Sequence, residues 1–350
     1  MFMLGVAVSS FVAGRLVDRF SARPILLICA LLAGGGIALC SQIHTIGQLR
    51  IFYAVAGLGV GATWSVPGSA VQRHFHGKNN SGLVLAIVIS GVGVGGLIFA
   101  PLADYLIINH GWRQAYIIIG IVCFALVGWS ALVIKGRPTH DDISAVQPPE
   151  HINKSSVSAA SISHIIKRPT FIGITFLVCL AELTFQAIAV HLVPHATDVG
   201  ISATSSAFAL GIIGGISIPG RILAGIMSEK TGWKSVMALS LGCIALCIIW
   251  LLMLKSTWML YSFVVLYGIV HGMAMTAEVG ILGEFFGMRW LGGLLGISSS
   301  IAFIAAALSP YILGFFYDST GSYTTAFFLI IGLLLSGSIL AVFMKKGEQK

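Results

Sequence analysis

Long apolar runs, uncharged except for Glu182 in one of them, recur along the sequence and constrain the fold more than any other feature. A helix that crosses a bilayer needs about 20 apolar residues, whereas a strand of a membrane barrel needs about 10 residues of alternating pattern. The runs are 1–14, 25–49, 51–72, 79–103, 114–134, 170–197, 199–220, 235–254, 256–277, 290–317 and 319–344. Their lengths exclude a barrel and predict an all-α membrane protein with 11 spans.

The composition agrees with a chain embedded in lipid. Only 9% of the residues are charged and 57% are hydrophobic, whereas soluble domains carry about 25% charged residues. The net charge of +8 comes from basic residues in short loops without interleaved aromatics, which argues against a nucleic-acid partner. The six cysteines lie inside apolar runs, so we expect packing residues and neither a metal site nor a cofactor.

The basic residues also predict the orientation, because lysine and arginine favour the cytoplasmic side of a membrane. With the loop 14–24 placed inside, 17 of the 20 Lys and Arg residues lie on the inner side. We therefore expect a multi-pass protein of the plasma (inner) membrane with a cytoplasmic C-terminus. An odd number of spans then places Met1 outside.

One charged loop occurs twice, as "GRLVDRFSARP" (14–24) and "GIMSEKTGWK" (225–234). The matching positions are all 211 residues apart: Gly14 and Gly225, Asp18 and Glu229, Arg19 and Lys230, Arg23 and Lys234. Two apolar runs precede the second loop, but only one precedes the first. The repeat thus predicts that a first helix is missing and is encoded upstream of Met1.

A polar segment divides the chain into two bundles. Residues 135–168 are rich in Ser, Ala and Pro and are predicted to form a cytoplasmic linker. We expect an N-terminal bundle of five spans over 1–134 and a C-terminal bundle of six over 169–350. Parallel halves joined in this way are typical of rocking transporters, in which the binding site lies between the halves.

Several motifs carry a family resemblance. The loop 14–24 resembles the signature of the major facilitator superfamily. The stretches "YAVAGLGVGATWSVPGSAVQRHF", "GWRQAY", "PGRILAGIMSEKTG" and "GEFFGMRWLGGLLG" are similar to its monocarboxylate porter and oxalate/formate antiporter branch. This resemblance implies two pseudo-symmetric helical bundles containing family helices 2–12. It also implies a monomer that carries a small organic anion, driven by protons or by a counter-anion.

The sequence departs from the branch at two places. Residues 290–317 contain no lysine, which weakens the case for exchange of a dianion such as oxalate. Ser217 stands where relatives have an acid four residues before an arginine, which leaves proton coupling by that pair in doubt. Proton-coupled drug efflux and a non-transporting sensor or truncated remnant are the alternative functions.

The resemblance implies that the repeated loops latch the two halves together. Asp18 would lie at the N-terminus of the helix that begins near Trp290, and Glu229 at the helix that begins near Ser81. Gly14 and Gly225 would let the backbones approach, while Arg19, Arg23 and Lys230 complete the loops. In the alternative interpretation, these are solvated basic loops that only set the topology.

Ionisable residues within spans are expensive, so each is a candidate for function. Arg221 lies seven residues before Ser228, and the resemblance implies that it binds an anionic substrate. Its alternative is to extend its charged end to the cytoplasmic interface. Glu182, with Gln186 one turn later, is predicted to contact the substrate or carry a proton, or else to pair with another polar residue.

His271, Met275 and Glu278 form one stripe on the predicted helix 256–277 and its continuation. His271 is predicted to bind substrate or relay a proton, with a packed, hydrogen-bonded histidine as the alternative. Trp64 is predicted to face the cavity, with packing as its alternative. No set of nucleophile, base and acid stands at a plausible site, so the chain is not expected to be an enzyme.

Overall fold

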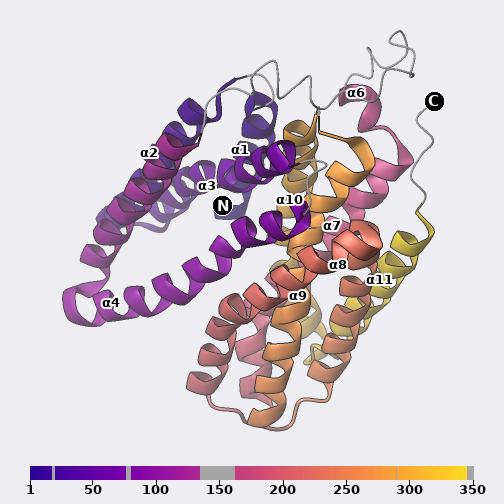
Figure 1. The fold of residues 1–350 in the computed structure, drawn as a ribbon. Helices are drawn as coiled ribbons and strands as arrows, with labels where there is room; N and C mark the ends of the chain where they lie inside the picture. Colours follow the sequence, from indigo (N-terminus) through magenta and orange to yellow (C-terminus); the bar gives the residue numbers. More distant parts are fainter. Residues whose placement is uncertain (18–19, 76–79, 135–161, 289, 345–350) are drawn as a thin grey trace.

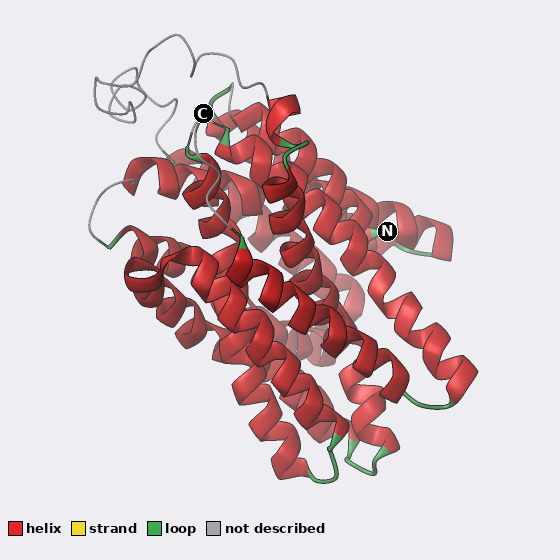
Figure 2. Cartoon of the chain, turned by 90° about the vertical axis from the view of Figure 1, so that its right-hand side faces the viewer, coloured by secondary structure: helices red, strands yellow, loops and turns green. Residues whose placement is uncertain are grey.

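The structure is a computed structural model that describes residues 1–17, 20–75, 80–134, 162–288 and 290–344. The described residues form helices joined by short loops and contain no strand (Figure 2). The helices are α1 (Phe2–Val17), α2 (Ala22–Leu39), η1 (Cys40–Gln42), α3 (Ile46–Phe75), α4 (Ser81–Val133), α6 (Ile162–Ile165), α7 (Pro169–Asp198), α8 (Ala203–Leu252), α9 (Thr257–Phe286), α10 (Leu291–Thr320) and α11 (Thr324–Phe343) (Figure 1).

The all-α membrane fold predicted from the apolar runs is confirmed, whereas the number of spans stays a prediction. Eight of the described helices are long and apolar enough to cross a membrane. α1 is apolar but has only 16 residues. α4 and α8, with 53 and 50 residues, each contain one non-helical glycine, Gly111 and Gly232. Each of these glycines divides its helix into two segments that coincide with two of the expected runs.

The structure differs from the expectation at the connections within α4 and α8. The sequence predicts breaks between the run that ends at 103 and the run that begins at 114, and between the runs that end at 220 and begin at 235, with a charged loop over 225–234. The helices instead continue through these residues and break only at a glycine with positive φ, 78° at Gly111 and 77° at Gly232. A helix satisfies its own backbone hydrogen bonds, so it can extend past the apolar zone into the polar interface.

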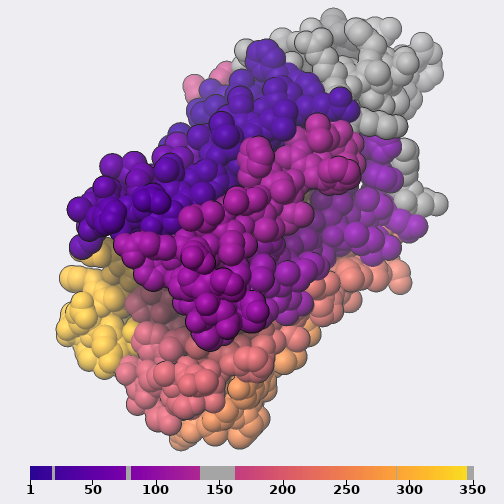
Figure 3. Space-filling view, turned by 90° about the vertical axis from the view of Figure 1, so that its left-hand side faces the viewer, coloured from indigo at the N-terminus to yellow at the C-terminus, as the bar shows by residue number. Residues whose placement is uncertain are grey.

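The helices pack as two groups that meet along two helix pairs. In the N-terminal half, α3 packs against α1 and α2, and α2 packs against α4. In the C-terminal half, α8 packs against α9 and α11, and α7 packs against α10. The halves touch through α1 with α10 and through α4 with α8. Figure 3 shows the N-terminal half, indigo to magenta, lying against the C-terminal half as one body.

The repeated basic position has the same role in both halves. Arg23 Nε donates to the carbonyl of Ile134, which is the C-cap of α4, at 2.9 Å. Lys234 Nζ donates to the carbonyls of Val342 and Met344 at the end of α11, at 3.2 Å each. A cation at a helix C-terminus satisfies free carbonyls and complements the helix dipole. In both halves, this residue therefore ties the charged loop to the last helix of its own bundle.

Candidate functional site

At one end of the bundle, the two halves touch through the backbone atoms of glycine residues. A Cβ atom built on Gly14 of α1 would lie 2.5 Å from the Gly292 carbonyl oxygen and 2.7 Å from Gly296 Cα, both on α10. One built on Gly225 of α8 would lie 2.6 Å from the carbonyl oxygen of Gly82 on α4. No real side chain tolerates such distances, so glycine is required at both contacts.

Side chains of one half also bind backbone carbonyls of the other. On α3, the Gln72 amide donates to the carbonyl of Val279, and Arg73 Nε donates to the carbonyl of Met288 at 3.2 Å. Ser300 Oγ of α10 donates to the carbonyl of Ala7 at 2.6 Å. These bonds hold α3 against the end of α9, and α10 against α1, so the halves are closed on each other along this surface.

Arg221 on α8 is the buried cation of this contact. Its side chain is only 2% exposed, and Nη1 donates across the halves to the carbonyl of Ile89 on α4 at 2.7 Å. Nε donates to Ser217 Oγ at 3.4 Å. The guanidinium thus points between the halves, away from the exposed surface. Among the described residues, this group makes the two hydrogen bonds above, and it carries five N–H donors in a planar fork.

The Glu182 carboxyl group lies near this guanidinium. Glu182 on α7 is 6% exposed and interacts electrostatically with Arg221. Its Oε1 atom is buried without a hydrogen-bond partner among the described residues. Gln186, one turn later, is half-buried. An unpartnered buried carboxylate oxygen is costly unless a ligand, a proton or water satisfies it.

His271 on α9 sits inside an aromatic stack. Its ring stacks on Phe185 with centroids 4.3 Å apart and on Tyr267 with centroids 5.7 Å apart, both within 6° of parallel. Arg221 acts on it electrostatically. Its Nδ1 atom has no hydrogen-bond partner within the described chain. The packing agrees with a structural histidine, while the unpartnered Nδ1 atom is a group that a ligand would satisfy.

A second carboxyl group, that of Glu278 on α9, completes the cluster. It is 2% exposed, and Ser299 Oγ of α10 donates to Oε1 at 3.0 Å. It interacts electrostatically with Glu182. The Trp64 indole N–H of α3 approaches it from the other half, without a hydrogen bond of standard geometry. The stripe of His271, Met275 and Glu278 contained the signal for this residue, yet sequence reasoning chose only His271 for the site.

The structure places part of the predicted latch. Asp18 and Arg19 lie outside the described residues. Glu229 and Lys230 are exposed at the end of the first segment of α8. Their neighbours Gly225 and Ser228 contact Gly82 at the start of α4. A latch role for Glu229 is thus compatible with its position and stays a prediction.

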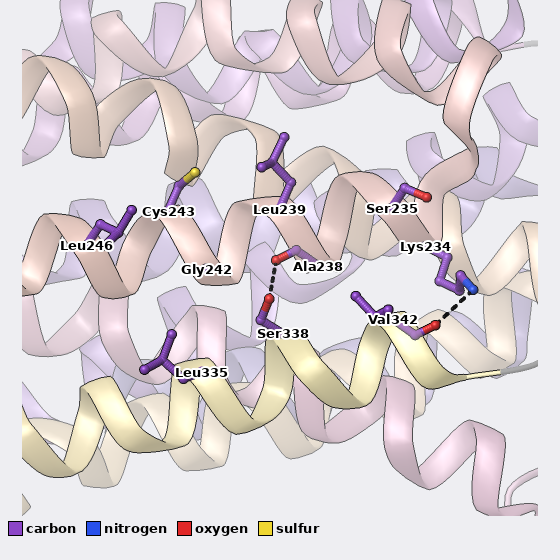
Figure 4. Close-up of a pocket in the computed structure, with 10 residues that line it drawn as sticks. All are labelled: Lys234, Ser235, Ala238, Leu239, Gly242, Cys243, Leu246, Leu335, Ser338 and Val342. Carbon is purple, nitrogen blue, oxygen red and sulfur yellow. Dashed lines mark hydrogen bonds between the residues drawn. The ribbon is translucent and has the colours of Figure 1, made fainter.

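A groove on the surface of the C-terminal half is separate from the buried cluster around Arg221. It lies between the second segment of α8 and α11, and Figure 4 shows Lys234 at one end of it. The Ser338 hydroxyl group donates to the carbonyl of Ala238 across it at 2.8 Å. Both hydrogen bonds drawn there tie α11 to α8. The groove contains none of the predicted substrate-binding residues.

The chain is similar in sequence to known membrane transporters over nearly its whole length. The sequence profile of the Major Facilitator Superfamily matches residues 1–277 and 219–350. The chain is 28% identical over 356 residues to monocarboxylate transporter 12 of Homo sapiens, covering 94% of this chain and 68% of that protein. It is 27% identical over 337 residues to the MFS-type transporter YcxA of Bacillus subtilis (strain 168), covering 92% and 79%.

Solved structures agree on the fold. The proton:xylose symporter XylE, bound to 6-bromo-6-deoxy-D-glucose, superposes with a TM-score of 0.78 at 14% sequence identity. The match covers 98% of this chain and 83% of that one. At this identity the likeness concerns the arrangement of the helices and carries no information about the substrate.

Proposed function

The chain belongs to the major facilitator superfamily, and we propose that it carries a small organic anion across the membrane by alternating access. The family and the helical fold predicted from the loop motifs are confirmed. Its relatives are transporters, so the protein is a multi-pass membrane transporter and not an enzyme. The proposal therefore concerns the substrate, the residues that bind it and the ion that drives it.

The buried guanidinium of Arg221 is the observation that carries the proposal. It lies between the halves, 2% exposed, with a carbonyl and a hydroxyl group as its hydrogen-bond partners. A carboxylate matches the two parallel donors of a guanidinium better than any neutral ligand does. The similarity to monocarboxylate transporter 12 supports the same substrate class.

Other groups around Arg221 complete the proposed site. Glu182, Gln186, His271 and Trp64 lie on α7, α9 and α3, so a ligand there would touch both halves. Such a site changes its exposure when the halves rock, which is the requirement for alternating access. We propose that the carrier works as a monomer in the plasma membrane, with protons or a counter-anion as the driving partner.

Uptake into proteoliposomes tests the substrate class. We expect radiolabelled lactate, pyruvate, benzoate or succinate to enter vesicles that contain the protein, and tetraphenylphosphonium to be left behind. Each is assayed with and without a pH gradient and with an unlabelled carboxylate inside. Transport of the lipophilic cation without any carboxylate would favour drug efflux, and transport of none would favour a sensor.

Cysteine labelling tests the orientation. In a variant without the six native cysteines, Lys255→Cys should react with an impermeant maleimide added outside intact cells, whereas Lys167→Cys should react only after permeabilisation. Both lysines are exposed, so accessibility from the two sides is the only difference between them. The reverse pattern would place the C-terminus outside. The linker and C-terminal lysines, Lys154 and Lys350, lie outside the described residues.

A further inference from the structure

The groove between the second segment of α8 and α11 has the length of a lipid chain rather than of a small polar ligand. Lys234 lies at one end of it and Leu246 at the other (Figure 4). Their separation along the helix corresponds to about 18 Å, at a rise of about 1.5 Å per residue. The volume of the groove is about 630 Å³, which is within the range of pockets that hold a ligand.

The walls of the groove are apolar and open to the membrane. Its floor is made of small residues, and a Cβ built on Gly242 of α8 would lie 3.3 Å from Ser338 Oγ of α11. Both helices are long and apolar enough to cross a membrane, so the medium outside the groove is the hydrocarbon of the bilayer. The exposed residues along its edges are Leu239, Leu246, Leu335 and Val342.

One end of the groove is positively charged. The ammonium group of Lys234 lies at this end and donates to two carbonyls at the end of α11. Lys167 and Arg168 are exposed just before α7. They lie at the same end of the bundle, because a Cβ built on Gly173 of α7 would lie 3.5 Å from Met344 Cε, directly after α11.

The acids near this end do not cancel that charge. Glu229 is exposed and directly followed by Lys230, which is exposed as well. Glu284 accepts the backbone N–H of Trp233 at 2.7 Å. Basic pockets between membrane helices bind the headgroups of anionic lipids. The groove therefore matches both parts of such a lipid, with an apolar channel for a chain and cations for a phosphate.

We propose that this groove binds one anionic phospholipid from the leaflet next to the charged loops. One acyl chain lies between α8 and α11, and the phosphate lies beside Lys234. The bound lipid touches both helices, so it stabilises their packing without reaching the buried cluster around Arg221. The proposal concerns the C-terminal half alone and does not depend on which substrate the protein carries.

Native mass spectrometry of the whole protein in detergent tests the proposal, because it counts the lipid molecules that stay bound. Dioleoylphosphatidylglycerol and dioleoylphosphatidylethanolamine are titrated separately, since they have the same chains and differ in net charge. We expect the wild type to bind the first phosphatidylglycerol about fivefold more tightly, which is the contribution of one cation near an anionic headgroup. Equal binding of the two lipids would overturn the proposal.

Variants of the basic residue test where the phosphate binds. Lys234→Gln should lose most of the preference for phosphatidylglycerol, and Lys234→Arg should keep it. Arg23→Gln is the matched control, because Arg23 also donates to a helix C-cap, that of α4, but does not line the groove. It should bind both lipids like the wild type. An unchanged preference in Lys234→Gln would overturn the proposal.

Filling the groove tests where the chain binds. Cys243→Phe should weaken the first binding event of both lipids, because the ring occupies the space of the acyl chain. Leu333→Phe is the control, since Leu333 is an exposed residue of α11 that does not line the groove. Unchanged lipid binding in Cys243→Phe would overturn the proposal. A dimer that disappears in Cys243→Phe would assign the groove to a second copy of the chain instead.

Thermal unfolding in detergent provides an independent measurement. Phosphatidylglycerol should raise the unfolding temperature of the wild type more than phosphatidylethanolamine does, and Lys234→Gln should abolish this difference. Without lipid, the unfolding temperatures of the variants show whether each of them is folded. If phosphatidylglycerol stabilises Lys234→Gln and the wild type equally, the lipid acts at another place and the proposal fails.

Discussion

Arg221→Lys is expected to weaken carboxylate binding about 10- to 150-fold, because a charge-assisted pair with good geometry is worth about 1.5–3 kcal/mol. Lysine keeps the positive charge but loses the planar fork that binds two carboxylate oxygens at once. Lysine also cannot bind Ile89 and Ser217 in the geometry seen for the guanidinium. The measurement is the concentration of carboxylate that gives half-maximal exchange in vesicles.

Arg221→Ala should weaken carboxylate binding more than Arg221→Lys does, since it also leaves Glu182 without a neighbouring positive charge. Membrane abundance and thermal unfolding in detergent control for misfolding. Arg73→Lys is the matched control, because Arg73 donates to a carbonyl of the other half and lies outside the buried cluster. Near-normal carboxylate affinity in Arg221→Lys would sink the role of Arg221 in binding and direct attention to Glu182 and His271.

Gly14→Ala is expected to shift the carrier away from the closed contact between α1 and α10. The added methyl group would overlap the Gly292 carbonyl and the Gly296 Cα, and both are backbone atoms that cannot rotate away. Overpacking of this kind costs about 1–3 kcal/mol. A cost of that size changes a conformational equilibrium by about 5- to 150-fold. We expect the halves to part at this end and net transport to fall.

Spin labels at Phe20 and Thr231 report this change, because both residues are exposed and lie on different halves at the end that carries the charged loops. The label-to-label distance should lengthen in Gly14→Ala. Gly91→Ala is the control, since a Cβ there meets nothing within 4 Å. An unchanged distance distribution in Gly14→Ala would mean that the contact yields without opening.

Glu229→Gln should also lengthen the distance between the two spin labels, but by less than Gly14→Ala does. An exposed carboxylate at a helix N-terminus is worth about 0.3–1 kcal/mol, and salt screens it. If the proposed latch exists, the same pair of spin labels should show a modest lengthening at low ionic strength that disappears at high ionic strength. An identical distribution in the variant and the wild type would leave the loops as topology signals.

The fold could be predicted from sequence because it depends mainly on the lengths of the apolar runs along the chain. Apolar length predicts helices in lipid, and the repeat of Gly14 at Gly225 reveals two related halves. The positions of helix ends could not be predicted in the same way. Helices continue through polar residues such as Asp104 and Arg113, because helical hydrogen bonding does not stop at the edge of the apolar zone.

The site was only partly predictable, for a different reason. Rarity of charge identifies Glu182, the one charged residue inside its apolar run, and the resemblance to the family draws attention to Arg221, which directly follows the run 199–220. Glu278 lies at the edge of a run, and its importance depends on Ser299 and Trp64, which come from other helices. Arg23 stays a predicted part of the latch, and its hydrogen bond to Ile134 of its own half had no signal in the sequence. Contacts of this kind depend on tertiary packing and have no local signature.

The single-residue connections at Gly111 and Gly232 have a mechanical consequence. Their backbone angles are nearly the same, with φ of 78° and 77° and ψ of 157° and 158°. The first segments of α4 and α8 face each other, as at Gly93 and Gly214, while the second segments pack on the outer helices α2 and α11. A joint one residue long has little slack, so it transmits torque. Rotation of the first segments at the contact is therefore expected to move the second segments together with the helices α2 and α11 that pack on them.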